Sequence, residues 1–232
     1  MFNPPPSSSP KWCDLPVQWS SHGLNLVYLQ RIHGLLMDCL ALHPRWSVFR
    51  VDLRVPQGSI LPPGAITDFI ESMKSQLTHA QAVKSASGKR GYDPMLRYVW
   101  VREWNDASNP HYHVALLLNR DAYFSLGDYS QLQSDECDYD AMLAGRIFKA
   151  WGVALGLDWP VVMKGVYFPP RPVSPLKTQH ELFQQQYRAV FYRLSYFAKN
   201  ESKVYGDGQR NFGMSQLHCL QIERPRAISW TN

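Results

Sequence analysis

Two runs of strand-forming residues, separated by a short polar loop, constrain the fold of this chain most strongly. Residues 95–104 (MLRYVWVREW) are rich in aromatic and β-branched side chains, and residues 112–118 are an apolar run within NPHYHVALLLN. Because the loop that joins them, residues 105–110, is so short, the two runs are expected to pair as an antiparallel hairpin. The chain is therefore expected to be built around a β-sheet.

The rest of the pattern alternates further strands with helices. Apolar spacings of three and four predict helices, and strict alternation at SVFRVDLRV predicts a strand with one wet face. The resulting order of strand, helix, strand, strand, helix, strand and helix predicts an α+β domain, with a central, mainly antiparallel sheet and flanking helices. The expected helices are 24–42, 65–86, 139–156 and 181–200, the further strands are 47–55, 161–168 and 211–217, and prolines break the chain at 169–175.

Length and composition are those of one globular domain of 232 residues. Residues 1–20 are rich in Pro and Ser and are expected to form a flexible arm, which leaves residues 21–232 as a single domain. No apolar stretch approaches the roughly 20 residues that span a bilayer, and the first residues lack the apolar core of a signal peptide. We therefore expect a soluble, cytoplasmic protein with no membrane partner.

Cysteine spacing and net charge add weaker constraints. The four cysteines are scattered without a CxxC pair, which indicates free thiols rather than a disulfide framework or a structural zinc site. The net charge of +5 is compatible with a polyanionic partner but does not require one.

Two histidines at the head of the apolar strand are candidate metal ligands. Residues i and i+2 of a strand share a face, so His111 and His113 point together while Tyr112 packs on the other face. Glu103 lies across the hairpin from them, and two imidazoles with one carboxylate suit Mg²⁺ or Mn²⁺ with open positions for substrate oxygens. The alternative is that the histidines are structural and that Glu103 forms an ordinary cross-strand pair.

The helix expected at 181–200 carries three tyrosines. Tyr187 falls in the apolar stripe and is a core candidate, whereas Tyr192 and Tyr196 project from another side, near Arg188 and Lys199. A phenol has a pKa of about 10 and is a poor nucleophile at neutral pH, a difficulty that nearby cations would reduce. The alternative is an amphipathic helix whose polar side happens to carry tyrosines.

This combination resembles the HUH endonuclease superfamily, in which two histidines flank a bulky hydrophobic residue and a later helix carries a nucleophilic tyrosine. His111-Tyr112-His113 matches the first motif, Tyr196 to Lys199 matches the YxxK form, and Tyr192 with Tyr196 also matches the two-tyrosine YxxxY form. VFRVDLRVP, SYFAK and NFGMS are similar to segments of inovirus-type replication proteins and YagK/YfjJ-like domains. The first-strand motif at 49–53 lacks the threonines that many replication initiators carry, so the DNA element recognised stays open.

The resemblance implies an RRM-like palm fold and a metal-dependent, single-strand-specific DNA nickase and strand transferase. Such an enzyme starts rolling-circle replication of a phage, prophage or plasmid-like element through a 5′-phosphotyrosine intermediate. His111, His113 and Glu103 would hold Mg²⁺ or Mn²⁺, Tyr196 would attack, Lys199 would stabilise the developing charge, and Tyr192 could act as a second nucleophile. The implied partners are single-stranded origin DNA and a helicase supplied by the host.

Basic and aromatic residues outside these motifs are candidate DNA contacts. A relaxase or transposase of the same superfamily, or a non-catalytic DNA-binding or regulatory protein on the same fold, are the alternative functions. Candidate phosphate contacts are Arg50, Arg54, Lys89, Arg90 and Arg97, and candidate base-stacking residues are Tyr98, Trp100 and Trp104.

Overall fold

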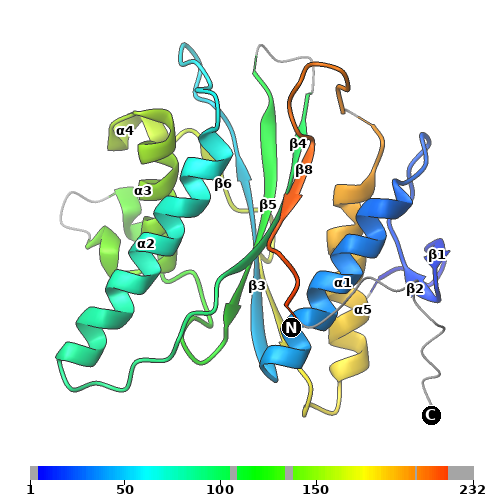
Figure 1. The fold of residues 1–232 in the computed structure, drawn as a ribbon, viewed down its shortest axis with the longest axis horizontal. Coiled ribbons are helices and arrows are strands. Elements are labelled where there is room, and N and C mark those ends of the chain that lie inside the picture. Colours follow the sequence, from blue (N-terminus) through cyan, green and yellow to red (C-terminus); the bar gives the residue numbers. More distant parts are fainter. Residues whose placement is uncertain (1–4, 105–108, 134–137, 202, 219–232) are drawn as a thin grey trace.

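An antiparallel sheet forms the centre of the protein (Figure 1). The structure is a computed structural model that describes residues 5–104, 109–133, 138–201 and 203–218. The sheet strands are β3 (Arg45–Leu53), β4 (Arg97–Glu103), β5 (His111–Asn119), β6 (Val166–Tyr167), β7 (Val173–Lys177) and β8 (Phe212–Met214). Their order is β6, β3, β5, β4 and β8, and β7 follows β6 along the same edge of β3. All pairings among the described strands are antiparallel, which confirms the predicted sheet.

Helices cover both faces of the sheet (Figure 1), which confirms the predicted α+β class. One face carries α2 (Ala65–Ala86), α3 (Leu143–Leu155) and α4 (Trp159–Val162). The other face carries α1 (Leu26–Leu42), α5 (Phe183–Leu194) and a small hairpin of β1 (Lys11–Trp12) and β2 (Leu15–Pro16). Short 3-10 helices lie before α3, at η1 (Tyr129–Gln133) and η2 (Tyr139–Ala141), and after α5, at η3 (Ser195–Ala198).

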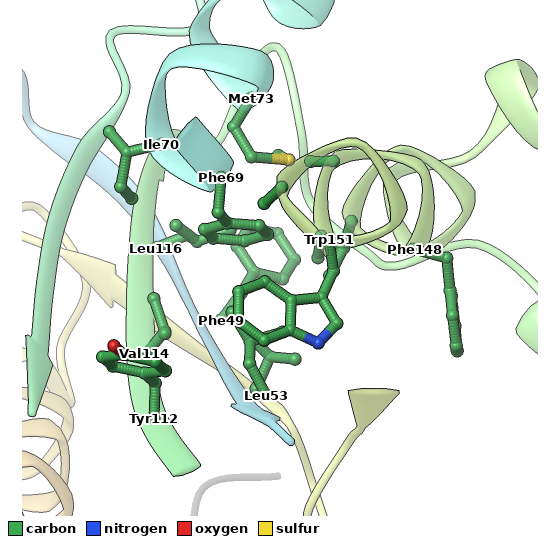
Figure 2. Close-up of a cluster of buried hydrophobic side chains, with 14 of the residues drawn as sticks. Phe49, Leu53, Phe69, Ile70, Met73, Tyr112, Val114, Leu116, Phe148 and Trp151 are labelled. Carbon is green, nitrogen blue, oxygen red and sulfur yellow. The ribbon is translucent and has the colours of Figure 1, made fainter. Parts of the chain in front are cut away.

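The core between the sheet and α2 and α3 is built from large apolar side chains (Figure 2). Trp151 of α3 lies edge-on to Phe69 of α2 and to Tyr112 of β5, with ring centroids 6.0 and 6.1 Å apart. Tyr112 therefore packs on this face, as its place between the two histidines predicts. Strand alternation sends His111 and His113 to the opposite face, toward α1 and α5.

Two expectations about residues 161–175 hold only in part. Val161 and Val162 belong to α4, whose first turn contains Pro160, and the strand β6 is confined to Val166–Tyr167. Proline suits the first turn of a helix because its missing N–H has no partner there in any case. The prolines at 169–175 interrupt the strands over residues 168–172, as predicted, but Pro175 lies within β7, where an edge strand tolerates its missing donor.

The N-terminal segment differs from the expected flexible arm over part of its length. Leu15 and Val17 are buried in the apolar cluster between the sheet, α1 and α5. The backbone N–H of Gln18 also donates to Ser195 Oγ at 2.9 Å. Apolar side chains at alternate positions in this Pro-rich stretch therefore dock residues 11–18 on α5.

Two further expectations concern cysteines and membrane spans. Cys13 and Cys39 are free thiols, as predicted, and Cys137 and Cys219 lie outside the described residues. Within the part of the chain that the structure describes, no helix has both the length and the apolar character that crossing a bilayer demands.

We expect Gly213→Ala to destabilise the protein by about 1–3 kcal/mol, because it overpacks the contact between β8 and β4. A Cβ on Gly213 would lie 2.5 Å from Cε2 and Cζ2 of the Trp100 indole. Urea unfolding measures the loss. In a Trp100→Phe background these two atoms are absent, so the same substitution should cost less. An equal cost in both backgrounds would show that the indole is not the obstacle.

Candidate metal centre

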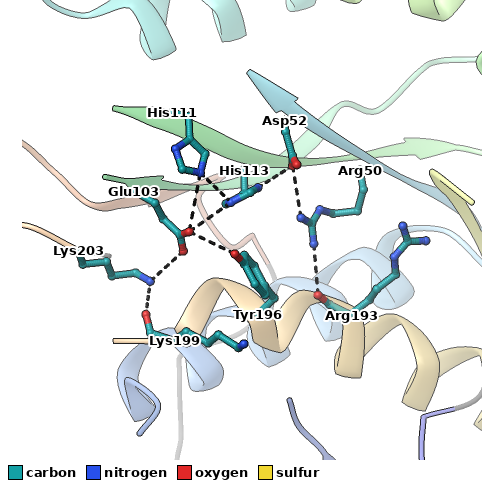
Figure 3. Close-up of polar contacts among 9 residues, drawn as sticks. All are labelled: Arg50, Asp52, Glu103, His111, His113, Arg193, Tyr196, Lys199 and Lys203. Carbon is teal, nitrogen blue, oxygen red and sulfur yellow. Dashed lines mark hydrogen bonds and ion pairs between the residues drawn. The ribbon is translucent and has the colours of Figure 1, made fainter. Parts of the chain in front are cut away.

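The β4–β5 hairpin brings Glu103, His111 and His113 to one point on the face that α1 and α5 cover (Figure 3). Nε2 of His113 lies 3.2 Å from Nε2 of His111 and 3.2 Å from Oε2 of Glu103. Nε2 of His111 lies 3.9 Å from the same carboxylate oxygen. All three side chains are buried. The hairpin register thus brings the three residues predicted as metal ligands together.

The spacing of these donor atoms fits a shared divalent cation. All three lie within 4.8 Å of one another. Two ligands about 2.1 Å from an octahedral ion and at right angles to each other would be ~3 Å apart, close to the shorter separations seen here. Two imidazoles and a carboxylate fill three positions and would leave others for substrate oxygens. The residues present therefore fit Mg²⁺ or Mn²⁺.

Asp52 of β3 fixes the orientation of His113. Because an ionised carboxylate can only accept, Nδ1 of His113 donates to Oδ1 of Asp52, at 2.6 Å. In the neutral imidazole this bond leaves Nε2 with its lone pair directed at the cluster, the arrangement that metal-ligating histidines commonly show. Burial alone would lower the pKa of His113, but hydrogen bonds to Asp52 and Glu103 outweigh it and raise that pKa. Burial likewise opposes ionisation of Asp52, yet His113 and Arg50 lower its pKa.

Arg50 is buried rather than exposed, so the expected wet face of the first strand is wrong at Arg50 and Asp52. Its guanidinium lies 3.5 Å from Oδ1 of Asp52 and donates to the carbonyl of Arg193 at 3.3 Å (Figure 3). It also stacks over the ring of Phe197, 4.5 Å from the centroid. β3 is flanked by strands and covered by helices on both faces, so charges on it are enclosed. Arg50 therefore joins the sheet to the helix that carries the tyrosines.

Tyr196 is the tyrosine at the cluster. Its phenol donates to Oε2 of Glu103 at 3.3 Å, and its ring lies edge-on to His113, with centroids 5.0 Å apart. Burial and the charge of Glu103 raise the pKa of Tyr196 to about 12. The phenol is therefore protonated at neutral pH in the metal-free protein.

The other two tyrosines of this segment lie elsewhere. Tyr187 is buried in the apolar cluster, as predicted. The carbonyl of Tyr192 accepts from Ser195 Oγ and from Gln18, but no described contact joins its side chain to the metal-ligand residues. Helical spacing alone does not separate Tyr192 from Tyr196, and the change from α5 to η3 places only Tyr196 against Glu103.

Two lysines flank the cluster. The ammonium of Lys199 lies over the ring face of Tyr196, 5.0 Å from its centroid. Lys203, which the sequence did not single out, is buried with its Nζ 3.4 Å from Oε1 of Glu103, and it donates to the carbonyl of Lys199. The chain leaves the helix at Lys199, so helical spacing could not have found Lys203.

Of the remaining predicted phosphate contacts, the structure brings only Arg54 to the cluster. Arg54 is exposed. Burial of His111 lowers the pKa of that histidine, and the charges of His113 and Arg54 lower it further. Arg97 pairs with the buried Asp38 at 3.5 Å, and at six residues from Glu103 along β4 it is ~20 Å from the site.

The other predicted DNA contacts are not at the cluster either. Lys89 and Arg90 lie in the exposed loop between α2 and β4, at the end of the sheet where β4 begins. Tyr98 and Trp100 pack into the core between the sheet and α2 and α3. Trp104 is half-buried beside the undescribed residues 105–108.

Comparison with known proteins gives relatives that cover most of the chain. Residues 11–215 match a family model described as the YagK/YfjJ C-terminal domain. The chain is 37% identical over 208 residues to the uncharacterized protein YagK of Escherichia coli (strain K12), which covers 85% of this chain and 96% of that protein. It is 33% identical over 202 residues to the uncharacterized protein YfjJ of the same strain, with 82% and 94% covered. No solved structure matches. The span matched by the family model includes every residue of the cluster.

We expect Mn²⁺ to raise the melting temperature of the protein, because a ligand that binds only the folded state stabilises it by about 2.7 kcal/mol at 100 times its Kd. His111→Ala should remove the shift, since it deletes one of the three donors. His79→Ala, which changes an exposed histidine of α2, should keep it. Differential scanning fluorimetry with increasing MnCl₂ measures this. An equal shift in the wild type and His111→Ala would mean that Mn²⁺ binds elsewhere.

We expect Asp52→Asn to weaken Mn²⁺ binding about 10- to 100-fold, the usual effect of losing a group that orients a metal ligand. An amide keeps the shape of the side chain but can present its N–H₂ to His113, which turns the imidazole away from the required tautomer. Calorimetric titration with MnCl₂ measures the affinity, and Asp68→Asn on the exposed first turn of α2 is the control. Unchanged affinity in Asp52→Asn would contradict the orienting role.

Proposed function

The chain belongs to the YagK/YfjJ C-terminal domain family, and we propose that it is an HUH-type nickase that cuts and rejoins single-stranded DNA. In this proposal it initiates rolling-circle replication of a phage, prophage or plasmid-like element. The observation that carries the proposal is the 3.3 Å contact between the Tyr196 phenol and Glu103, which lies beside His111 and His113. A nucleophile held within hydrogen-bond reach of a metal-ligand set can attack a group bound there.

Mg²⁺ or Mn²⁺ on these three ligands would polarise the scissile phosphate and offset its developing charge. The chain's own residues prepare that position. Asp52 holds His113 in one tautomer, and Lys203 contacts the Glu103 oxygen that faces away from the histidines. His113 and Glu103 thus have preset orientations before substrate arrives, which reduces the reorganisation that the reaction requires.

Tyr196 carries the covalent step. A bond forms between its phenolic oxygen and phosphorus while the bond from phosphorus to the 3′ oxygen breaks, and the electron pair leaves with that oxygen. The phenolic proton passes to water and the 3′ oxygen takes one up, so protons balance. The product is a 5′-phosphotyrosine and a free 3′-hydroxyl that can prime synthesis. Attack by a 3′-hydroxyl reverses the step, so rejoining needs no ATP.

Two features of the site bear on how the phenol becomes reactive. Burial and the Glu103 carboxylate raise the pKa of Tyr196, and a bound cation would neutralise the second of these causes. Lys199 lies over the ring face, where its charge favours the electron-rich phenolate. Both effects act on the oxygen proposed to attack.

We expect wild-type protein with Mn²⁺ to form a covalent adduct with labelled single-stranded DNA, and Tyr196→Phe to form none. Phenylalanine keeps the ring against His113 but lacks the attacking oxygen. The substrates are oligonucleotides that tile the DNA around the gene for this chain, and adducts are resolved on denaturing gels. Tyr192→Phe is the matched control and should retain the first cleavage.

Three outcomes of that assay would count against the proposal. An undiminished adduct in Tyr196→Phe would exclude this tyrosine as the nucleophile. An adduct that resists EDTA would exclude the metal centre. DNA binding without any adduct across the tiled set would favour a non-catalytic DNA-binding protein.

A further inference from the structure

We infer that the single strand lies across the sheet edge where β6 pairs with β3, with one base stacked on Tyr167 and flanking phosphates bound by Arg54 and Arg171. The inference rests on the proposed nickase function and identifies the surface that would hold its substrate. Three observations carry it: the face to which Tyr167 points, its lack of a partner, and the arginines around it.

The strand register fixes the direction of Tyr167. Asp52 pairs with His113 on one side and with Tyr167 on the other, and directly opposed residues of antiparallel strands point to the same face. Tyr167 therefore lies on the face of the candidate metal centre, two strands or about 10 Å from His113. The next residue, Phe168, packs on the opposite face against Phe148, as alternation requires.

Tyr167 is an exposed aromatic side chain without a described partner. It is 50% exposed, and no hydrogen bond or ring contact joins its side chain to the described residues. Aromatic side chains beside a backbone-binding groove commonly stack single-stranded bases, since every base has a π-face. Tyr167 is thus placed to stack a base that flanks the scissile phosphate.

Arginines surround this edge. Arg54 follows β3 directly, and continuing the register past Asp52 and His113 sets it opposite His111. Arg171 is exposed, and Arg193 beneath it donates to the carbonyls of Pro170, at 3.0 Å, and of Arg171.

The positive charge of Arg193 is only partly offset by a nearby carboxylate. Burial lowers the pKa of Arg193 to about 10, and Arg50 and Arg171 add to that effect, while Asp52 opposes it. Several cations gathered at one edge of a sheet attract a polyanion. The backbone of a single strand supplies phosphates at regular spacing, which neither a small anion nor an isolated carboxylate does.

The opposite end of the sheet offers a matched control. Arg90 lies over the ring of Tyr92, 4.9 Å from its centroid, and Tyr92 is 37% exposed. This pair has the same composition as Arg54 and Tyr167 but lies far from the candidate metal centre. Substitutions there remove an exposed arginine or tyrosine without touching the proposed DNA path.

Fluorescence anisotropy with labelled oligo-dT in EDTA tests the inference without cleavage. We expect Tyr167→Ala to weaken binding roughly 5- to 100-fold, the range for loss of one stacked base, with the salt dependence unchanged. Tyr167→Phe should bind like wild type. Arg54→Ala should reduce the slope of log K against log salt by about 0.7, the value for one phosphate contact on a single strand. Tyr92→Ala and Arg90→Ala should bind like wild type.

The inference is overturned if Tyr167→Ala and Arg54→Ala bind like wild type, or if the far-end variants cause the loss. Tighter binding of oligo-U than of oligo-dT would overturn DNA as the ligand. Unchanged thermal melting of Tyr167→Ala, a half-exposed residue, excludes misfolding as the cause of weaker binding. Because binding is read in EDTA, without cleavage, failure of this inference can be told apart from failure of the nickase proposal in the adduct assay.

Discussion

The hydrogen bond between His113 and Asp52 is the contact on which the rest of the site depends. It exists only because β3 and β5 pair in a register that sets Asp52 opposite His113, with 2.6 Å between Nδ1 and Oδ1. The same carboxylate holds Arg50, which reaches the carbonyl of Arg193 in the helix before Tyr196. One line of buried polar contacts therefore connects the candidate ligands to the helix that leads to Tyr196, the proposed nucleophile.

Removing this many charged groups from water costs free energy, and favourable burial elsewhere in the fold has to offset that cost. Breaking a buried ion pair by removing one partner typically costs about 3–5 kcal/mol, so each member stabilises the placement of the others. Apolar clusters on both faces of the sheet supply the compensating burial, and one of them encloses the polar line between the sheet, α1 and α5. The candidate metal ligands are thus buried and held by contacts from several elements of the fold.

The sequence predicted the parts of the site that local periodicity determines. Alternation places His111 with His113, the short hairpin loop places Glu103 beside them, and the predicted helix at 65–86 has the observed bounds. Asp52 and Lys203 could not be found this way. Charges on a strand ordinarily face water, and Asp52 is enclosed because β3 has strands on both sides and helices on both faces. Lys203 follows a break in the helix.

The partner that a basic residue finds was also beyond local patterns. Arg97 lies on the same strand as Glu103 but at its other end, bound to Asp38. The sequence did not single out Tyr167, because the strand expected at 161–168 is instead a short helix and, after it, a strand of two residues. The direction of the Tyr167 side chain follows only from the pairing of β6 with β3. Long-range register, rather than composition, decides which of these side chains meet.

The most direct test of the central claim is peptide mapping of the cleaved DNA adduct by mass spectrometry. Trypsin cuts after Arg188, Arg193 and Lys199, so Tyr192 and Tyr196 fall in separate peptides, AVFYR and LSYFAK. The account predicts that, in the presence of Mn²⁺, a nucleotide joined through its 5′ phosphate appears on LSYFAK. Cleaved DNA with an unmodified LSYFAK peptide, or a nucleotide on AVFYR alone, would contradict it.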